Sequence, residues 1–335
     1  MRRKVDAAIR WSWPITHYVY YAWLRLRTPK PSRSSIGQST RLISERLVGS
    51  NPPGKKERKT MKKILIPIWQ EKKQYHLNTA YVDYVHRAGY QAIMVGYDAN
   101  PIEMAKFADG LLLSGGGDID PVYYGNENIA AYWPDPERDA IERELYWAFV
   151  DKQKPIFGIC RGFQLIFLEE ELVTRNTEQE VKELNFRQHF GGHSQTERAL
   201  RWIRTHRVYY CPGLYDLSNP SLDLDTKMFV NSMHHQGVKW NSTVKGNTRY
   251  LCEVNGPIVP LAYAPAASKE PLILEAFTVH GKNVLAVQWH PEELMDVALL
   301  WNIFGEPVGA DQAMKTYIEQ MESLLGVTED KNEAN

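Results

Sequence analysis

Cysteine is scarce in this sequence, with three residues among 335 and no Cys-x-x-Cys pair. Thiols so few and so spaced exclude a disulfide framework and a thiolate zinc site. The simplest compartment for such a chain is the cytoplasm. The count by itself singles out none of the three cysteines, and we find no internal repeat.

Basic residues are in short supply in most of the chain. Lys and Arg balance Asp and Glu overall, at 40 each, but residues 1–60 contain 14 basic and 3 acidic residues, which leaves 26 against 37 for the rest. Because phosphate binding needs a basic face, this acidic body argues against a nucleic-acid partner. With 43% hydrophobic residues, the chain can bury one large core or two small ones.

Long hydrophobic runs are missing as well. The aromatic-rich segment from Trp11 to Leu24 is too short to span a bilayer, and it contains Pro14 and His17. A basic start before an apolar stretch suggests a signal sequence, but no small-residue cleavage site follows cleanly. Residues 25–60 are polar, basic and interrupted by Pro and Gly, which is typical of a disordered segment.

The first sixty residues also allow a different interpretation. Gly49–Pro52 is what the T-loop of a bacterial transfer-RNA gene encodes when read as codons, and Ser34–Ser39 resembles a translated D-loop. We favour the hypothesis that the recorded start lies too far upstream and that translation begins at Met61. The alternative is a basic tail or membrane-surface anchor. The intact mass of the protein from its native host distinguishes the two.

Short apolar runs alternate with helix-like segments after Met61, which is the pattern of a parallel sheet covered on both faces. The predicted strands are Ile64–Ile68, Gln91–Val95, Gly110–Leu113 and Pro155–Ile159. The predicted helices are His76–Ala88, Asp139–Lys152 and Arg161–Leu172. We therefore predict a three-layer, flavodoxin-like α/β domain with a mostly parallel central sheet.

The second half of the chain is richer in β structure. Its predicted strands are Met228–Val230, Leu272–Val279 and Val284–Gln288, with a hairpin turn at Gly281–Asn283 between the last two. These strands predict an antiparallel β extension of the sheet. An amphipathic helix is expected at Asp311–Leu325. A single domain over residues 61–327 and a disordered tail at 328–335 fit this pattern.

The most informative stretch runs from Pro155 to Gln164, where a strand ends, Cys160 occupies the turn and a helix begins. Such a turn strains the backbone and requires small residues on both sides, which Gly158 and Gly162 supply. The helix start favours a reactive thiolate, and the Arg161 N–H points where an oxyanion would form. By itself the pattern fits a buried structural cysteine equally well.

A second strand end carries the partners that a cysteine nucleophile needs. Pro291 biases His290 toward an extended backbone, so that Glu292 can reach the face that His290 occupies. An imidazole held by a carboxylate takes a proton on its other nitrogen. A lone histidine at a strand end is more often structural, but this pair follows an elbow cysteine.

Together, Gly-x-Cys-x-Gly-x-Gln and a late His-Pro-Glu resemble the class I glutamine amidotransferase fold. The fuller set of motifs resembles its gamma-glutamyl-GABA hydrolase branch, in order as well as content. The resemblance spans about Ile64 to Leu294 and is carried by Ser114–Gly125, Arg138-Asp139, Cys160–Gln164, Val230–Gln236 and Gln288–Glu292.

The resemblance implies Cys160 as nucleophile, His290 as base and Glu292 as the residue that orients it. Gly116 or Gly117 would donate the second oxyanion N–H, at the strand end where open α/β sheets bind ligands. Three glycines in a row are otherwise simply a tight turn.

Other motif positions keep two interpretations each. Gln164 lies near the glutamyl group or is a solvated helix residue. The adjacent His234 and His235 match a motif near the site, and a direct catalytic role is the less favoured interpretation of either residue. The remaining pairs are Asp118 and Asp120, which contact the substrate amine or cap a turn, and Arg138 and Asp139, which form a structural ion pair or helix cap.

The sequence departs from the family just after the elbow. A small-residue Leu-Gly-Gly-Thr-Leu segment is usual there, whereas this chain has Phe167–Thr174 with three consecutive glutamates, then a polar stretch over 175–187. Gly191-Gly192-His193 comes too late to replace the glycines without a rearranged loop. His206 matches a position before the next strand. The departure affects the expected substrate range more than the expected chemistry.

The implied function is hydrolysis of a gamma-glutamyl amide through a thioester, which releases glutamate and an amine such as GABA. It requires no metal or organic cofactor, and the implied partner is a small-molecule gamma-glutamyl substrate rather than a nucleic acid or membrane. Two alternatives stay open: a glutaminase subunit that passes ammonia to a synthase, and a catalytically silent gamma-glutamyl-binding protein. The oligomeric state is not fixed by the sequence, and a homodimer is one option.

Overall fold

The computed structural model describes residues 60–71, 73–174, 186–188, 201–210, 227–240, 242–245, 248–251, 256–264 and 272–307. The predictions for residues 1–59, Gly191–His193, the helix Asp311–Leu325 and the tail 328–335 lie outside this part. Within the described ranges, no helix combines the length and the apolar character that crossing a membrane requires.

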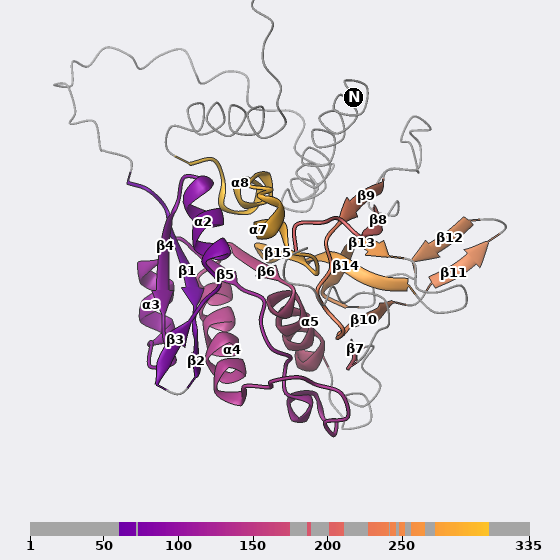
Figure 1. Ribbon diagram of the computed structural model, residues 1–335, viewed down its shortest axis with the longest axis horizontal. Helices are drawn as coiled ribbons and strands as arrows, with labels where there is room; N and C mark the ends of the chain where they lie inside the picture. The colour runs from indigo at the N-terminus through magenta and orange to yellow at the C-terminus, as the bar shows by residue number, and fades with distance from the viewer. Residues whose placement is uncertain are drawn as a thin grey trace, which may run out of the picture.

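One eleven-stranded sheet organises the molecule (Figure 1). Five neighbouring strands run parallel, in the order β4 (Gln91–Val95), β1 (Lys63–Pro67), β5 (Gly110–Leu113), β6 (Ile156–Ile159) and β15 (Val284–Val287). The sheet then continues antiparallel through β14 (Leu272–Val279), β13 (Ile258–Ala264), β8 (His206–Tyr210) and β9 (Lys227–Val230). The predicted α/β fold with an antiparallel β extension is therefore confirmed.

Shorter strands lie at the margins of this sheet. A branch off β14 is formed by β10 (Gly237–Trp240), which pairs in turn with β7 (Phe186–Arg187). Two separate hairpins are formed by β2 (Trp69–Glu71) with β3 (Gln74–His76) and by β11 (Ser242–Lys245) with β12 (Thr248–Leu251). The sequence pattern predicted neither hairpin.

Helices cover both faces of the parallel strands (Figure 1). The core on one face includes side chains of α2 (Thr79–Arg87) and α8 (Ala298–Phe304), and the core on the other includes those of α3 (Pro101–Phe107), α4 (Pro136–Asp151) and α5 (Arg161–Val173). Alternate residues of β5 enter the two cores, Leu112 on one side and Leu111 and Leu113 on the other. Each fully buried leucine contributes about 1.5–3 kcal/mol, which explains the unbroken apolar strands.

Capping residues explain where the helix boundaries differ from the prediction. The helix expected from His76 begins at Thr79, because Asn78 accepts a hydrogen bond from the Ala80 N–H at 3.0 Å and His76 ends β3. The helix expected from Asp139 begins at Pro136, after the N-cap Asp135. The unpredicted α3 has the same signal, since Asn100 caps it and Pro101 opens it.

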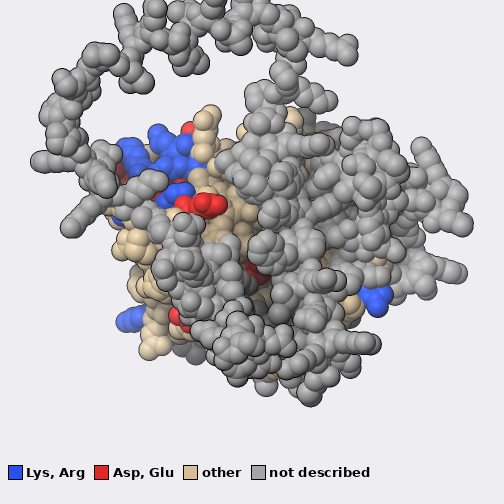
Figure 2. All heavy atoms as spheres, turned by 90° about the horizontal axis from the view of Figure 1, so that it is seen from above, with Lys and Arg blue, Asp and Glu red and all other residues tan. Residues whose placement is uncertain are grey.

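Figure 2 views the molecule from above and shows the charged side chains of the described residues on that face. The largest group of basic side chains lies near one edge with acidic side chains beside it, and a few other basic side chains lie apart from it at the lower left and lower right.

Candidate active site

Cys160 occupies a strained turn between β6 and α5. Its φ is 53° and its ψ is −102°, a backbone conformation that residues with a side chain rarely adopt. The parallel strand leads directly into the turn, and the helix begins one residue later. Its side chain is nearly buried, at 6% exposure. The geometry is that of the predicted nucleophile elbow.

Close packing at the elbow requires both flanking glycines. A Cβ on Gly158 would lie 2.6 Å from the Ile166 Cδ1 and 2.9 Å from the Gly162 backbone. A Cβ on Gly162 would overlap the Leu113 carbonyl of the neighbouring strand. The interpretation that small residues allow the turn is therefore supported by two separate backbone contacts.

His290 and Glu292 lie together at the end of β15, which pairs with β6. The His290 Nδ1 is 2.6 Å from the Glu292 Oε1, and both side chains are buried. His290 is the residue just before helix α7 (Pro291–Leu294), and Glu292 is the second residue of that helix. The ring's other nitrogen, Nε2, is buried without a hydrogen-bond partner in the described structure.

The glycine loop after β5 brings the elbow and the histidine to one point. A Cβ on Gly115 would lie 2.9 Å from the His290 Cε1 and 3.4 Å from the Cys160 Cβ. Cys160 and His290 therefore pack against the same side of one glycine. With Nδ1 committed to Glu292, Nε2 is the nitrogen available to the thiol.

Electrostatics favour a charged imidazole in this place. Burial alone would lower the pKa of His290, but the negative charge of Glu292 and the interaction with the Cys160 side chain outweigh it and raise the pKa to about 10. At neutral pH His290 is thus protonated, which suits a residue that has taken a thiol proton and must give one to a leaving group.

Three main-chain N–H groups border the site without a hydrogen-bond acceptor in the described part of the chain: those of Gly116, Gly117 and Arg161. Arg161 is the first residue of α5, where N–H groups lack an acceptor within the helix. Gly116 and Gly117 are the loop positions at which the sequence predicted oxyanion donors. The neighbouring Gly115 N–H is instead held by Tyr81, whose hydroxyl oxygen accepts it at 2.9 Å.

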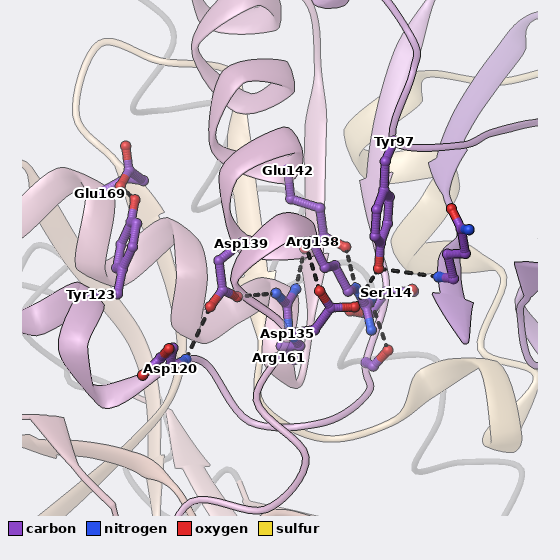
Figure 3. Close-up of polar contacts among 12 residues, drawn as sticks. Tyr97, Ser114, Asp120, Tyr123, Asp135, Arg138, Asp139, Glu142, Arg161 and Glu169 are labelled. Carbon is purple, nitrogen blue, oxygen red and sulfur yellow. Dashed lines mark hydrogen bonds and ion pairs between the residues drawn. The ribbon is translucent and has the colours of Figure 1, made fainter. Parts of the chain in front are cut away.

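A buried network of ion pairs joins the elbow, α4 and the glycine loop (Figure 3). The Arg161 guanidinium pairs with Asp139 and Glu142, and Arg138 pairs with the same Glu142 at 2.7 Å. Arg138 also donates to the carbonyls of Ser114 and Gly115, at 3.3 and 3.1 Å. The expected ion pair between Arg138 and Asp139 is therefore wrong. Arg138 pairs with Glu142 instead, and Asp139 pairs with Arg161.

The Gln164 side chain is buried rather than solvated, at 2% exposure. Its Nε2 donates to the Gln236 carbonyl at 3.1 Å and to the Gln288 Oε1 at 3.3 Å. His234 Nδ1 lies 2.8 Å from the same Gln236 carbonyl, while its Nε2 is 3.8 Å from Glu275. These residues join the elbow helix to the loop before β10.

Glu275 lies between two imidazoles. His206, the first residue of β8, lies 3.1 Å from its Oε1. Burial would raise the pKa of Glu275, but the hydrogen bonds and charges of His206 and His234 lower it to about 2. The carboxylate is therefore ionised across the physiological pH range.

The two aspartates of the glycine-loop motif have separate roles. Asp120 caps the short helix η1 (Pro121–Tyr124), accepting from the Val122 N–H at 3.0 Å, as one of its two interpretations predicted. Asp118 instead lies 2.6 Å from the Nε2 of His235. The motif residues Asp118 and His235 are thus brought together by the fold.

The atypical glutamates after the elbow continue the helix. Helix α5 runs to Val173, and Glu169 and Glu170 are buried. Glu169 accepts from Tyr123 and Trp147, and Glu170 lies 2.5 Å from the Lys282 Nζ. Carboxylates held by neighbouring elements therefore replace the usual small residues, and the following segment 175–185 lies outside the described residues.

Sequence reasoning missed two residues of the site. Asn231 brackets the His290 backbone: its Nδ2 donates to the His290 carbonyl at 3.0 Å and its Oδ1 accepts from the His290 N–H at 3.1 Å. Tyr81, from α2, lies 3.4 Å from the His290 Nδ1. Asn231 stood in a recognised motif, but Tyr81 had no signal beyond its place on the buried face of a helix.

Tyr81→Phe tests the link between the glycine loop and the histidine. Without the hydroxyl, the buried Gly115 N–H loses its acceptor, which costs about 1–3 kcal/mol. We expect turnover on the best substrate to fall about tenfold, with a small decrease in Tm. Tyr84→Phe in the same helix is the control, because its hydroxyl donates to the Asp296 carbonyl instead. Equal kcat values for the two variants would contradict a role for Tyr81 in positioning.

A cavity of about 840 Å³ lies elsewhere, along α4 between α3 and η1. Its walls include Ile102, Tyr123 and Trp147, and none of Cys160, His290 and Glu292 lines it. Geometry and chemistry therefore place the candidate site at the ends of the parallel strands. In the described ranges, no group of three or more His, Cys, Asp or Glu side chains could hold a metal ion.

The match to a family model decides the family, because it covers Cys160 as well as His290 and Glu292. The model of the family described as Peptidase C26 matches residues 59–292, from before the first strand to Glu292. The chain belongs to the peptidase C26 family. Membership of peptidase C26, a class I glutamine amidotransferase-like family, indicates a hydrolase and agrees with the resemblance seen in the motifs.

Relatives of this peptidase C26 member carry two kinds of name. The glutamine amidotransferase-like protein YvdE of Lactococcus lactis is 26% identical over 68% of this chain and 84% of its own length. The gamma-glutamyl-gamma-aminobutyrate hydrolase of Escherichia coli O157:H7 is 27% identical over 55% of this chain and 64% of its own length. The glutaminase domain of Trypanosoma brucei CTPS with bound acivicin is 13% identical, with a TM-score of 0.44, over 73% of this chain and 94% of that one.

Proposed function

We propose that this protein hydrolyses a gamma-glutamyl amide bond, with Cys160 as nucleophile, and releases glutamate and an amine such as GABA. The observation that carries the proposal is that the elbow cysteine and His290 pack against the same glycine, while the buried Glu292 carboxylate holds the His290 ring at 2.6 Å. Such a triad is used for acyl transfer from an amide. The hydrolase among the relatives supports the choice of bond.

The proposed cycle assigns one step to each group. The Cys160 thiolate attacks the gamma-carbonyl carbon, and the Arg161 N–H with the Gly116 or Gly117 N–H stabilises the oxyanion. Protonated His290 gives its proton to the nitrogen of the leaving amine as the C–N bond breaks, which leaves a glutamyl thioester. Water, deprotonated by His290, then attacks the thioester and releases glutamate and the thiolate.

The rival proposal within the family is a glutaminase that passes ammonia to a synthase. Relatives whose names describe them as glutamine amidotransferase-like support this alternative. We propose instead that the protein acts alone on a small gamma-glutamyl molecule. We place this activity in the cytoplasm, a compartment that the low cysteine content supports.

A substrate panel tests the proposal. Purified protein is given gamma-glutamyl-GABA, gamma-glutamyl dipeptides and glutamine, and the release of glutamate, amine and ammonia is measured. We expect glutamate and free amine from a gamma-glutamyl amide, with kcat/KM at least about tenfold above that for glutamine. Glutamine as the preferred substrate would favour the glutaminase. An absence of turnover, and of Cys160 labelling by a gamma-glutamyl electrophile, would favour a silent binding protein.

A further inference from the structure

Two exposed aromatic rings lie side by side on the segment that joins η1 to α4. Tyr132 is 58% exposed and Trp133 is 86% exposed, and their ring centroids are 6.2 Å apart. We call these two residues the aromatic rim. Large apolar side chains exposed together, rather than singly, mark binding surfaces.

The backbone holds the aromatic rim in place. The Asp118 N–H donates to the Tyr132 carbonyl at 2.9 Å, and the Tyr132 N–H donates to the Asp118 carboxylate at 2.6 Å. Trp133 has a φ of 51°, which is unfavourable for a bulky side chain and more so before Pro134. Strain of this kind persists only where the surroundings fix it, and it gathers at functional sites.

The glycine loop connects the aromatic rim to the thiol. A Cβ on Gly117 would overlap the Trp133 carbonyl and lie 3.3 Å from the Trp133 Cβ. Only glycine at position 117 therefore leaves room for Trp133 in its observed place. Two residues earlier, the Cβ position of Gly115 is 3.4 Å from the Cys160 Cβ. The same short loop therefore borders the nucleophile and supports Trp133.

The polar groups beneath the aromatic rim are already engaged. The Tyr132 ring packs on the His235 ring, with centroids 4.6 Å apart. That imidazole has both nitrogens at acceptors, the Asp118 carboxylate at 2.6 Å and the Gln188 carbonyl at 3.0 Å. The rim thus offers ring faces, and the imidazole behind it is already engaged at both nitrogens.

The exposed ring faces suit the amine part of a gamma-glutamyl amide and not its glutamyl part. The glutamyl part carries an ammonium and a carboxylate, which need charged or polar partners, whereas the amine part varies. We propose that Tyr132 and Trp133 form the subsite for the amine leaving group and select amines that carry an aromatic or similarly flat apolar group. This inference rests on the proposed function and specifies the substrate class for it.

Paired substrates test the aromatic rim. The ratio of kcat/KM for gamma-glutamyl-phenethylamide to that for gamma-glutamyl-methylamide isolates the contribution of the amine's ring. In Trp133→Asn, which removes the ring but tolerates positive φ, we expect this ratio to fall about tenfold. Trp133→Phe should keep the ratio within about threefold of the wild type, because an aromatic face remains. Ile129→Ala, at a position 82% exposed in the same segment, is the matched control and should leave the ratio unchanged.

Each other outcome overturns the inference in a recognisable way. Wild-type protein that hydrolyses gamma-glutamyl amides with the same ratio as Trp133→Asn would remove the rim's role and leave the proposed function intact. A preference for gamma-glutamyl-putrescine, also lost in Trp133→Asn, would assign the rim to cationic amines instead. Wild-type protein that hydrolyses none of these amides, with glutamine as its only substrate or with no turnover at all, would remove both proposals.

Discussion

Replacing Cys160 with alanine is expected to lower kcat on a gamma-glutamyl amide by about 10⁴-fold or more, to the activity that binding and the oxyanion donors alone supply. Nucleophile and base act as a unit, so removing either one costs nearly the whole effect. The change removes a single atom from a nearly buried side chain, so the fold should be retained. Steady-state release of glutamate, with Tm measured alongside, checks both expectations.

The other two cysteines provide the control for Cys160→Ala. Cys211→Ala and Cys252→Ala remove a thiol of the same kind elsewhere in the chain and should leave kcat within about twofold. A gamma-glutamyl electrophile should add one label per chain to wild-type protein and none to Cys160→Ala. Turnover that survives in Cys160→Ala would contradict the assignment of the nucleophile.

Glu292→Gln should lower kcat by about 10²-fold to 10⁴-fold, because the amide no longer stabilises the imidazolium and can hold the wrong tautomer. The charge of Glu292 helps to raise the pKa of His290 to about 10. Without that charge the pKa of His290 falls, and the alkaline decline in kcat/KM should move to lower pH by more than one pH unit. The pH profile measures this shift, which a purely structural defect would not produce.

The same pKa determines how stability depends on pH. Because folding raises the pKa of His290 from 6.5 to about 10, its protonation contributes stability that is fully present below pH 6.5 and is lost as the pH rises through about 10. Glu292→Gln should reduce this alkaline loss of stability. Glu293→Gln is the control, since Glu293 pairs with Arg201 at 2.7 Å rather than with His290. Identical pH profiles for the two variants would contradict the role of Glu292.

Much of the fold could be predicted because local patterns and burial agree. The strands β4 and β5 fall at the residues that their apolar runs indicated. All of β5 is buried, as is typical of a parallel strand covered on both faces, whereas β4 is the edge strand and is only partly buried. Helix α5 ends one residue beyond its predicted end. The hairpin of β2 and β3 was missed, because strands of only three residues are too short to show a period.

The partners of the candidate site were less predictable. Asp139 pairs with Arg161 of another helix, and no spacing rule selects that contact. The Arg138–Glu142 pair, by contrast, has the i, i+4 spacing of neighbours on one helix, and the sequence could have indicated it. Tyr81 reaches the site because α2 packs beside the glycine loop, although its helix position reads only as core. Such contacts depend on how elements pack, which a local pattern does not encode.

By itself the sequence determined the α/β fold, the strand–turn–helix around Cys160 and the proximity of His290 to Glu292. Each of these depends on residues a few positions apart, whose backbone geometry fixes what they can contact. Only the tertiary structure decided that Cys160 and His290 both pack against Gly115, that Asn231 holds the His290 backbone and that Trp133 packs on the glycine loop. Those contacts join residues far apart in the chain. Gly115, Cys160 and His290 meet because the parallel strands β5, β6 and β15 align their carboxyl ends at one edge of the sheet, whereas Asn231 and Trp133 come from segments outside these strands.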